Sequence, residues 1–231
     1  MPSLTPVMRI LLLAHVTLFA ASGPLRAREP SVSYFMAVFA AQVDSNDPSL
    51  THSFATFIRA TAPSDSAKDV RVDVHTISWM PQSLNILLLQ TSPEPGANLD
   101  LKTSLRWAES RNCRVSMWGP YKIEKELFDR AVAQELRLKS GRVQYKAVDR
   151  HFRPGVASNC IHAVSDLDNR NGLMDSGQLS GDAASRQIVQ HLDHWIVDHG
   201  QSNAWMARRL GLKVDSVNPR DPEQRLVLIS R

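Results

Sequence analysis

Cysteine is scarce in this sequence, because the 231 residues contain only Cys113 and Cys160. A scaffold held by many disulfides is therefore excluded, although an even pair in an exported chain is a candidate for one bridge. Long apolar runs are also lacking after the N-terminal region, where nothing approaches the ~20 residues of a transmembrane helix. Basic and acidic residues nearly balance, and no Lys/Arg block is interleaved with aromatic residues, so nucleic-acid binding is not predicted.

The N-terminal region has the three-part layout of a secretory signal peptide. Arg9 precedes an apolar run over residues 10–21, and small residues and the segment Leu25-Arg26-Ala27 follow. We predict a signal peptide over residues 1–27 and a periplasmic or secreted mature protein with no transmembrane segment. The full sequence has 43% hydrophobic and 22% charged residues, and we predict that residues 31–231 form one globular domain.

Two neighbouring predicted strands each carry one histidine. An apolar run over residues 33–43 predicts a buried strand, and residues 51–61 and 70–79 predict two more. Alternation places His52 on the same face as Phe54 and Thr56, and His75 on the same face as Trp79.

Later segments add helices to these strands. Short strands are predicted over residues 84–89, 113–118, 143–148 and 226–229, and helices over residues 98–108, 122–139, 184–198 and 203–210, with Asn98 as the cap of the first helix and Gly141 as the stop of the second. The predicted fold class is α+β, with an antiparallel sheet of about five or six strands packed against helices.

Cys160 follows two good helix-capping residues, Ser158 and Asn159. We therefore expect Cys160 in the first turn of a helix, where unpaired backbone N–H groups favour an anion and lower the pKa of a thiol. Such a thiol is suited to nucleophilic catalysis if a base can take its proton. The alternative that the residues leave open is a structural thiol, paired with Cys113 in a disulfide.

The segments around His52, His75 and Asn159-Cys160-x-His162 together resemble a known family. The order of a histidine strand before the nucleophile helix is similar to the circularly permuted branch of the NlpC-type papain-like cysteine hydrolases, which includes lecithin:retinol acyltransferase-like proteins. The chain is also similar to bacterial periplasmic domains of uncertain function that share a His-x-Phe strand and a late Asn-Cys helix start.

This resemblance implies a permuted papain-like fold and an exported thiol hydrolase or acyltransferase. Cys160 would be the nucleophile, His52 the general base and His75 the group that orients the imidazole, with no cofactor. The implied substrates are cell-envelope peptides or lipids, cleaved or transferred through a Cys160 thioester. The rival is a non-catalytic binding or structural domain with a Cys113–Cys160 disulfide, and a zinc site of Cys160, His162, His52 and His75 is a third possibility. His162 is expected to point away from the thiol.

Overall fold

The computed structural model of the chain describes residues 30–63, 69–149, 156–168, 180–199, 203–217 and 223–226. Its centre is an antiparallel sheet with the strand order β10-β11-β6-β1-β2-β3, and β9 pairs with β6 beside that path. A smaller sheet has the order β4-β5-β7-β8. The strands are β1 (Ser31–Gln42), β2 (His52–Ala62), β3 (Arg71–Ile77), β4 (Trp79–Pro81), β5 (Glu94–Asn98), β6 (Arg114–Ile123), β7 (Gln144–Tyr145), β8 (Ala157–Ser158), β9 (Ile196–Asp198), β10 (Val214–Val217) and β11 (Glu223–Leu226).

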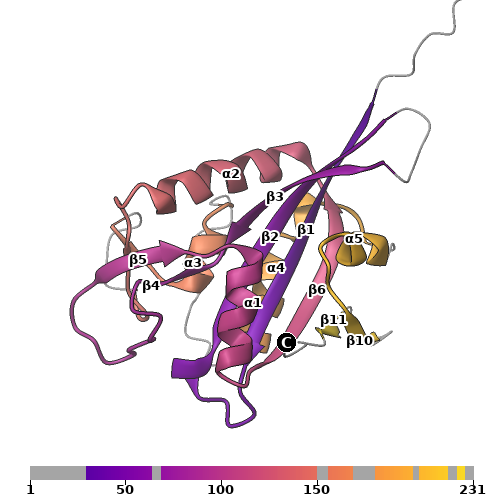
Figure 1. The fold of residues 1–231 in the computed structure, drawn as a ribbon. Coiled ribbons are helices and arrows are strands. Elements are labelled where there is room, and N and C mark those ends of the chain that lie inside the picture. The colour runs from indigo at the N-terminus through magenta and orange to yellow at the C-terminus, as the bar shows by residue number, and fades with distance from the viewer. Residues whose placement is uncertain are drawn as a thin grey trace, which may run out of the picture.

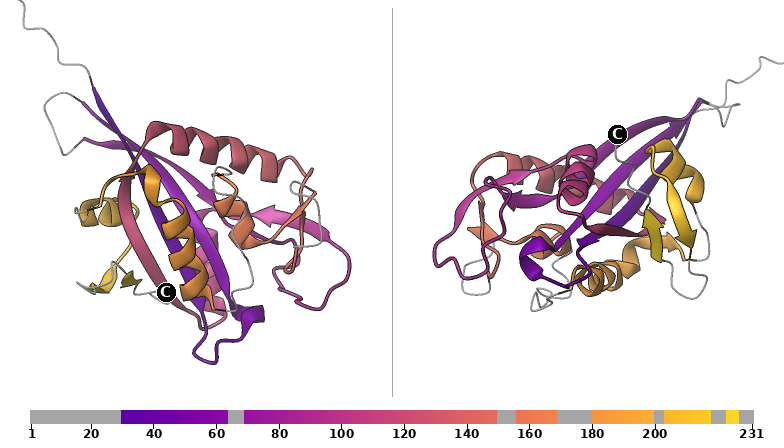
Figure 2. Two further views of the ribbon diagram at one scale, coloured as in Figure 1. Left: turned by 180° about the vertical axis from the view of Figure 1, so that it is seen from behind. Right: turned by 60° about the horizontal axis from the view of Figure 1, so that its bottom comes forward.

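Helices cover both faces of the central sheet. They are α1 (Leu101–Ser110), α2 (Lys125–Lys139), α3 (Cys160–Ser165), α4 (Gly181–His191) and α5 (Ala204–Arg209), with 3-10 turns at Pro48–Leu50 and Asp193–Trp195. The views from the front and from behind place α1 and α5 on one face and α3 and α4 on the other, with α2 packed along the same side as α3 (Figures 1 and 2). The α+β class is confirmed, and the central sheet as described has seven strands where we predicted about five or six.

The position of β1 between two cores explains why its sequence is continuously apolar. Met36, Val38 and Ala40 pack into the core under α2, α3 and α4, whereas Ala37 and Phe39 pack into the core under α1. A strand that is buried on both faces has no polar alternation to show. This division of side chains also separates the two faces on which the predicted site residues lie.

The predicted strand over residues 70–79 is divided in two at Ser78. The Ser78 backbone N–H donates to Asn98 Oδ1 at 2.9 Å, and Asn98 Nδ2 donates to the Thr76 carbonyl at 2.7 Å. The chain thus leaves the central sheet after β3 and enters the smaller sheet as β4. Asn98 is therefore not the predicted helix cap; Asp100 caps α1 by accepting from the Thr103 N–H at 2.6 Å.

The predicted strand over residues 84–89 is wrong, because this segment is a loop between β4 and β5. Leu84 has a positive φ of 58° and Leu89 is 96% exposed, although Ile86 is buried. The predicted helix over residues 122–139 begins later, since β6 continues to Ile123. The predicted signal peptide over residues 1–27 and residues 227–229 of the closing strand lie outside the described residues.

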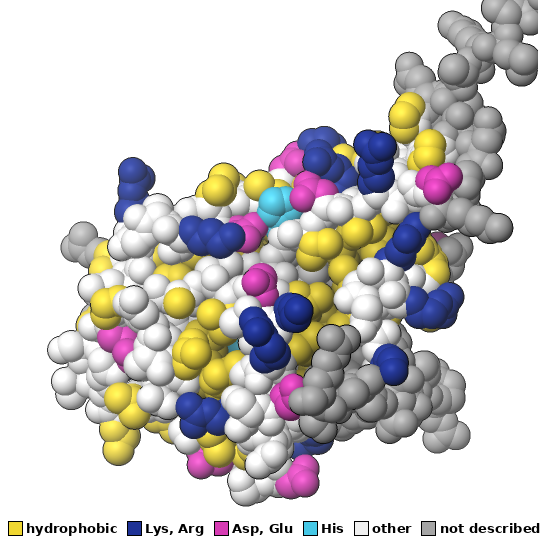
Figure 3. All heavy atoms as spheres, in the orientation of Figure 1, with side chains coloured by type: hydrophobic (Ala, Val, Ile, Leu, Met, Phe, Trp, Pro, Cys, Tyr) yellow, Lys and Arg dark blue, Asp and Glu magenta, His cyan; other side chains and the backbone are white. Residues whose placement is uncertain are grey.

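Within the described ranges, no helix combines the length and apolar character needed to cross a bilayer. On the face shown in Figure 3, basic and acidic side chains are interspersed rather than gathered by sign.

Candidate functional site around Cys160

Cys160 opens α3, as the capping pattern predicted. Asn159 is the N-cap, and its Oδ1 accepts a hydrogen bond from the His162 backbone N–H at 2.8 Å. The short strand β8 leads directly into this helix, and its Ser158 carbonyl accepts from Trp79 Nε1 at 3.1 Å. Because Trp79 is buried, the position at which α3 begins is fixed by the core. The helix packs against β2.

Opposing influences act on the thiol of Cys160, a half-buried residue at the start of α3. The nearby backbone N–H groups of Ser53, Cys160 and Ile161 favour the thiolate and lower the pKa of the thiol. Removal from water acts more strongly in the other direction, and the nearby Asp149 carboxylate adds to it, so the pKa of the thiol is raised to about 11. The thiol is therefore protonated at neutral pH, contrary to the expectation of a lowered pKa.

Asp149 is the residue of this site that the sequence reasoning missed. Its side chain is buried, and Oδ2 accepts from the Asn159 backbone N–H at 2.9 Å and lies 2.7 Å from His162 Nδ1. Its Oδ1 accepts from Asn159 Nδ2 at 3.1 Å. The only sequence signal was an acidic residue directly after the predicted strand over residues 143–148. His162, predicted to point away from the thiol, has its ring held by this carboxylate.

The structure does not bring His52, the predicted base, beside Cys160. It is completely buried under α1, where its Nε2 lies 2.8 Å from Ser78 Oγ and its ring packs against Phe54 and Trp107. Burial lowers the pKa of its imidazole to about 3. An imidazole with this pKa stays neutral at pH 7 and cannot hold the proton of a thiol.

The reason for this correction lies in the layers of the fold. His52 faces the core under α1, together with Phe54, whereas Cys160 packs against the core under α2, α3 and α4. The thiol does meet β2, but at the backbone N–H of Ser53 rather than at the imidazole of His52. None of the interactions among the described residues joins Cys160 to His52.

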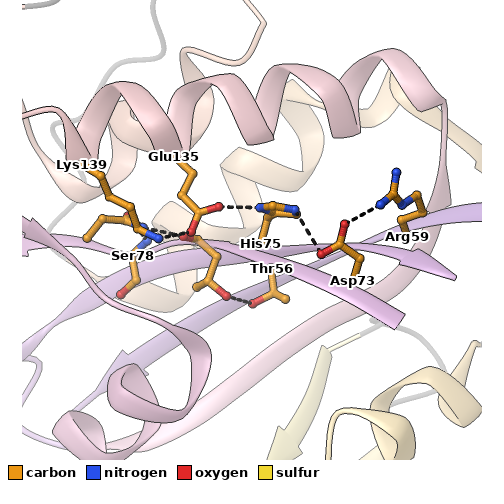
Figure 4. A network of polar contacts seen from close by, with 9 residues as sticks. Thr56, Arg59, Asp73, His75, Ser78, Glu135 and Lys139 are labelled. Atoms are coloured by element: carbon orange, nitrogen blue, oxygen red, sulfur yellow. Dashed lines mark hydrogen bonds and ion pairs between the residues drawn. The ribbon is translucent and has the colours of Figure 1, made fainter. Parts of the chain in front are cut away.

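His75 does not orient the His52 imidazole either. Its Nδ1 lies 2.6 Å from Glu135 Oε2 on α2, and its Nε2 lies 3.4 Å from Asp73 Oδ1 on the same strand. Figure 4 shows this chain of contacts, which Lys139 extends at the Glu135 end and Arg59 at the Asp73 end. These contacts tie β3 to α2 and do not bring His75 to the His52 imidazole.

The predicted Cys113–Cys160 disulfide is not formed, because both thiols are free. Cys113 packs in the core under α1, and its Sγ donates to the Leu50 carbonyl at 3.4 Å. Cys160 packs on the other face of the sheet. The four proposed zinc ligands are likewise dispersed, and the part of the chain that the structure describes contains no group of three or more His, Cys, Asp or Glu placed to hold a metal ion.

The chain was compared with protein-family models, curated proteins and solved structures. No family model matches the chain, and no curated protein or solved structure is significantly similar to it.

Proposed function

We propose that this chain is an exported thiol hydrolase or acyltransferase of permuted papain-like type, with Cys160 as its nucleophile. The observation that carries the proposal is the placement of Cys160 at the start of α3, directly after its N-cap Asn159, where unpaired backbone N–H groups favour an anion. The Asn-Cys-x-His segment and its resemblance to the papain-like family support the same assignment. The resemblance suggests cell-envelope peptides or lipids as substrates.

The proposed reaction is acyl transfer through a thioester. The Cys160 sulfur attacks the carbonyl carbon of an amide or ester, and the amine or alcohol leaves with the proton that the thiol gave up. Water or an acceptor alcohol or amine then takes the acyl group and restores the thiol. The backbone N–H groups of Ser53 and Cys160 are the natural donors for the oxyanion that develops during the attack.

The high pKa of the resting thiol limits which substrates can react. With a pKa of about 11, roughly one thiol in 10,000 is ionised at pH 7. Because the proposal no longer uses His52 or His75, the proton must pass to the leaving group or to solvent during the attack. Substrates with good leaving groups should therefore react first.

The experiment that tests the proposal is a search for the thioester. The protein is incubated with p-nitrophenyl acetate and p-nitrophenyl butyrate, and the products are located by intact mass and peptide mapping. We expect one hydroxylamine-sensitive acyl group on Cys160, absent from Cys160→Ser and retained in Cys113→Ser. Acylation confined to lysines or to Cys113 would exclude Cys160 as the nucleophile.

A non-catalytic binding or structural domain is the second candidate, now without a disulfide. The observation that favours it is the combination of a protonated thiol with histidines that are engaged elsewhere, His52 with Ser78 and His75 with Glu135. This candidate predicts that neither ester acylates Cys160. It also predicts that Cys160→Ser leaves the stability of the fold nearly unchanged, since serine can receive the same backbone donors.

A further inference from the structure

The side chains around Cys160 are organised by one carboxylate, that of Asp149. Asn159 precedes the cysteine and gives Asp149 two hydrogen bonds, from its backbone N–H at 2.9 Å and from its Nδ2 at 3.1 Å. His162 follows the cysteine and places Nδ1 2.7 Å from Asp149 Oδ2. One buried group thus holds the residues on both sides of the nucleophile.

These contacts also connect Asp149 with the helix cap. The Oδ1 atom of Asn159 accepts from the His162 backbone N–H, while the amide nitrogen of the same side chain is bound to Asp149. The carboxylate therefore fixes which way the Asn159 amide points and keeps its oxygen available to cap α3. Loss of Asp149 would leave the cap free to turn and the first turn of α3 free to move.

We propose that Asp149 is a positioning residue for Cys160: its hydrogen bonds fix the start of α3 around the thiol, and they hold a buried carboxylate next to the residues on both sides of it. This deepens the proposed function, because it rests on Cys160 being the reactive group. The two effects act in opposite directions on reactivity. The hydrogen bonds hold the first turn of α3, where a thiolate is favoured, while the charge opposes formation of the thiolate.

Other titratable groups near this pair must be considered in a pH experiment. Tyr145 on β7 interacts with Cys160 and Asp149, and Asp166, the C-cap of α3, interacts with Asp149 and His162. Arg137 on α2 and His191 on α4 act in turn on Asp166. Burial raises the pKa of Tyr145 well above its ordinary value, and burial also raises the pKa of Asp166. Among the charges acting on the Cys160 thiol itself, that of Asp149 is the one that opposes ionisation.

The test is the rate at which iodoacetamide alkylates Cys160 between pH 6 and pH 12, followed by peptide mapping, in the full chain. In Asp149→Asn, which keeps the shape of the side chain, the midpoint of the rate profile should move to lower pH and the rate at pH 7 should rise. In His162→Asn the carboxylate stays, so the midpoint should not fall. Asp100→Asn is the matched control, because Asp100 caps α1 on the other face of the sheet.

A helix start that is merely loosened would behave differently. It would expose the thiol in both Asp149→Asn and His162→Asn, and the midpoint would fall equally in the two variants. That result, or an unchanged midpoint in a folded Asp149→Asn protein, would overturn the proposal. Cys113 is buried and should stay unlabelled wherever the fold is intact.

If Asp149→Asn does not fold, Asp149→Glu is the variant that tests the proposal. Glutamate keeps the charge, so the midpoint of the wild type should be retained, and a fall in the midpoint would contradict the electrostatic part of the proposal. Alkylation needs no turnover. A shifted midpoint in Asp149→Asn, with no acyl adduct on Cys160, would therefore refute the proposed function and leave the role of Asp149 intact. An acyl adduct on Cys160 with no shift of the midpoint would refute the role of Asp149 and leave the proposed function intact.

Discussion

Acid should destabilise this protein through His52 more than through any exposed histidine. The imidazole is completely buried, with Nε2 at Ser78 Oγ and, among the described residues, no hydrogen-bond partner for Nδ1. Protonation would place a second N–H where the described part of the chain offers no acceptor, beside the rings of Phe54 and Trp107. The pKa of the folded state is accordingly lowered from 6.5 to about 3.

The magnitude follows from the difference between the folded and unfolded pKa values. Because the unfolded chain binds the proton first, this contribution to stability is fully present above pH 6.5 and is lost as the pH falls toward 3. At 1.36 kcal/mol per pH unit, the loss is about 2 kcal/mol at pH 5 and approaches about 5 kcal/mol near pH 3. Domains of this kind are commonly stable by about 5–15 kcal/mol, so the effect is a large fraction of the total.

The assay is urea unfolding at pH 7 and pH 5 in the wild type and in His52→Gln. Glutamine can place an N–H near the Nε2 position and keep the bond to Ser78, but it does not titrate. All other histidines are common to the two proteins, so the difference between their pH dependences isolates His52. We expect the wild type to lose about 2 kcal/mol more than the variant between the two pH values. Equal losses would refute the assignment of a neutral, buried imidazole.

Three further substitutions test other contacts. Gly96→Ala should lower the free energy of unfolding by about 1–3 kcal/mol in urea, because a Cβ there would lie 2.0 Å from the buried ring of Trp79; an unchanged value would show that the ring can move. Asn159→Ala should cost about 0.5–2 kcal/mol in the same assay through loss of the α3 cap, and a smaller effect would contradict the observed capping. Glu135→Gln should cost less than about 1 kcal/mol in thermal unfolding, because its contact with His75 is partly exposed; a larger loss would mean that the β3–α2 contact is underestimated.

The elements with a strong local signal were predictable from sequence. The apolar run of β1 indicated a buried strand, and the spacing of apolar residues indicated α2. The capping pattern placed Cys160 in the first turn of a helix, which is the observed position. Each of these features depends on residues that are close together in the chain.

The errors arose where distant segments decide the outcome. Alternation correctly placed His52 with Phe54 on one face of β2, but it could not tell which helix covers that face. That helix is α1, so the imidazole is buried with Trp107 and Ser78 rather than beside the thiol. In the same way, the apolar composition of residues 84–89 suggested a strand, although no neighbouring strand is available for it to pair with in the described sheets.

The role of Asp149 was also beyond local reasoning. Its partners Asn159 and His162 lie on a different segment, and nothing about the spacing of these three residues indicates contact. The carboxylate becomes recognisable only when the end of the β7 segment and the start of α3 are brought together by the parallel pairing of β7 with β8.

The measurement that tests the account most directly is alkylation of the unreduced protein with iodoacetamide from pH 5 to pH 10, with peptide mapping, in wild type and in His52→Gln. The account predicts slow labelling of Cys160 that rises throughout this range, an identical profile in the variant, and no linked Cys113–Cys160 peptide. Rapid labelling of Cys160 at pH 6 that is lost in His52→Gln would contradict it, because it would show that His52 activates the thiol after all.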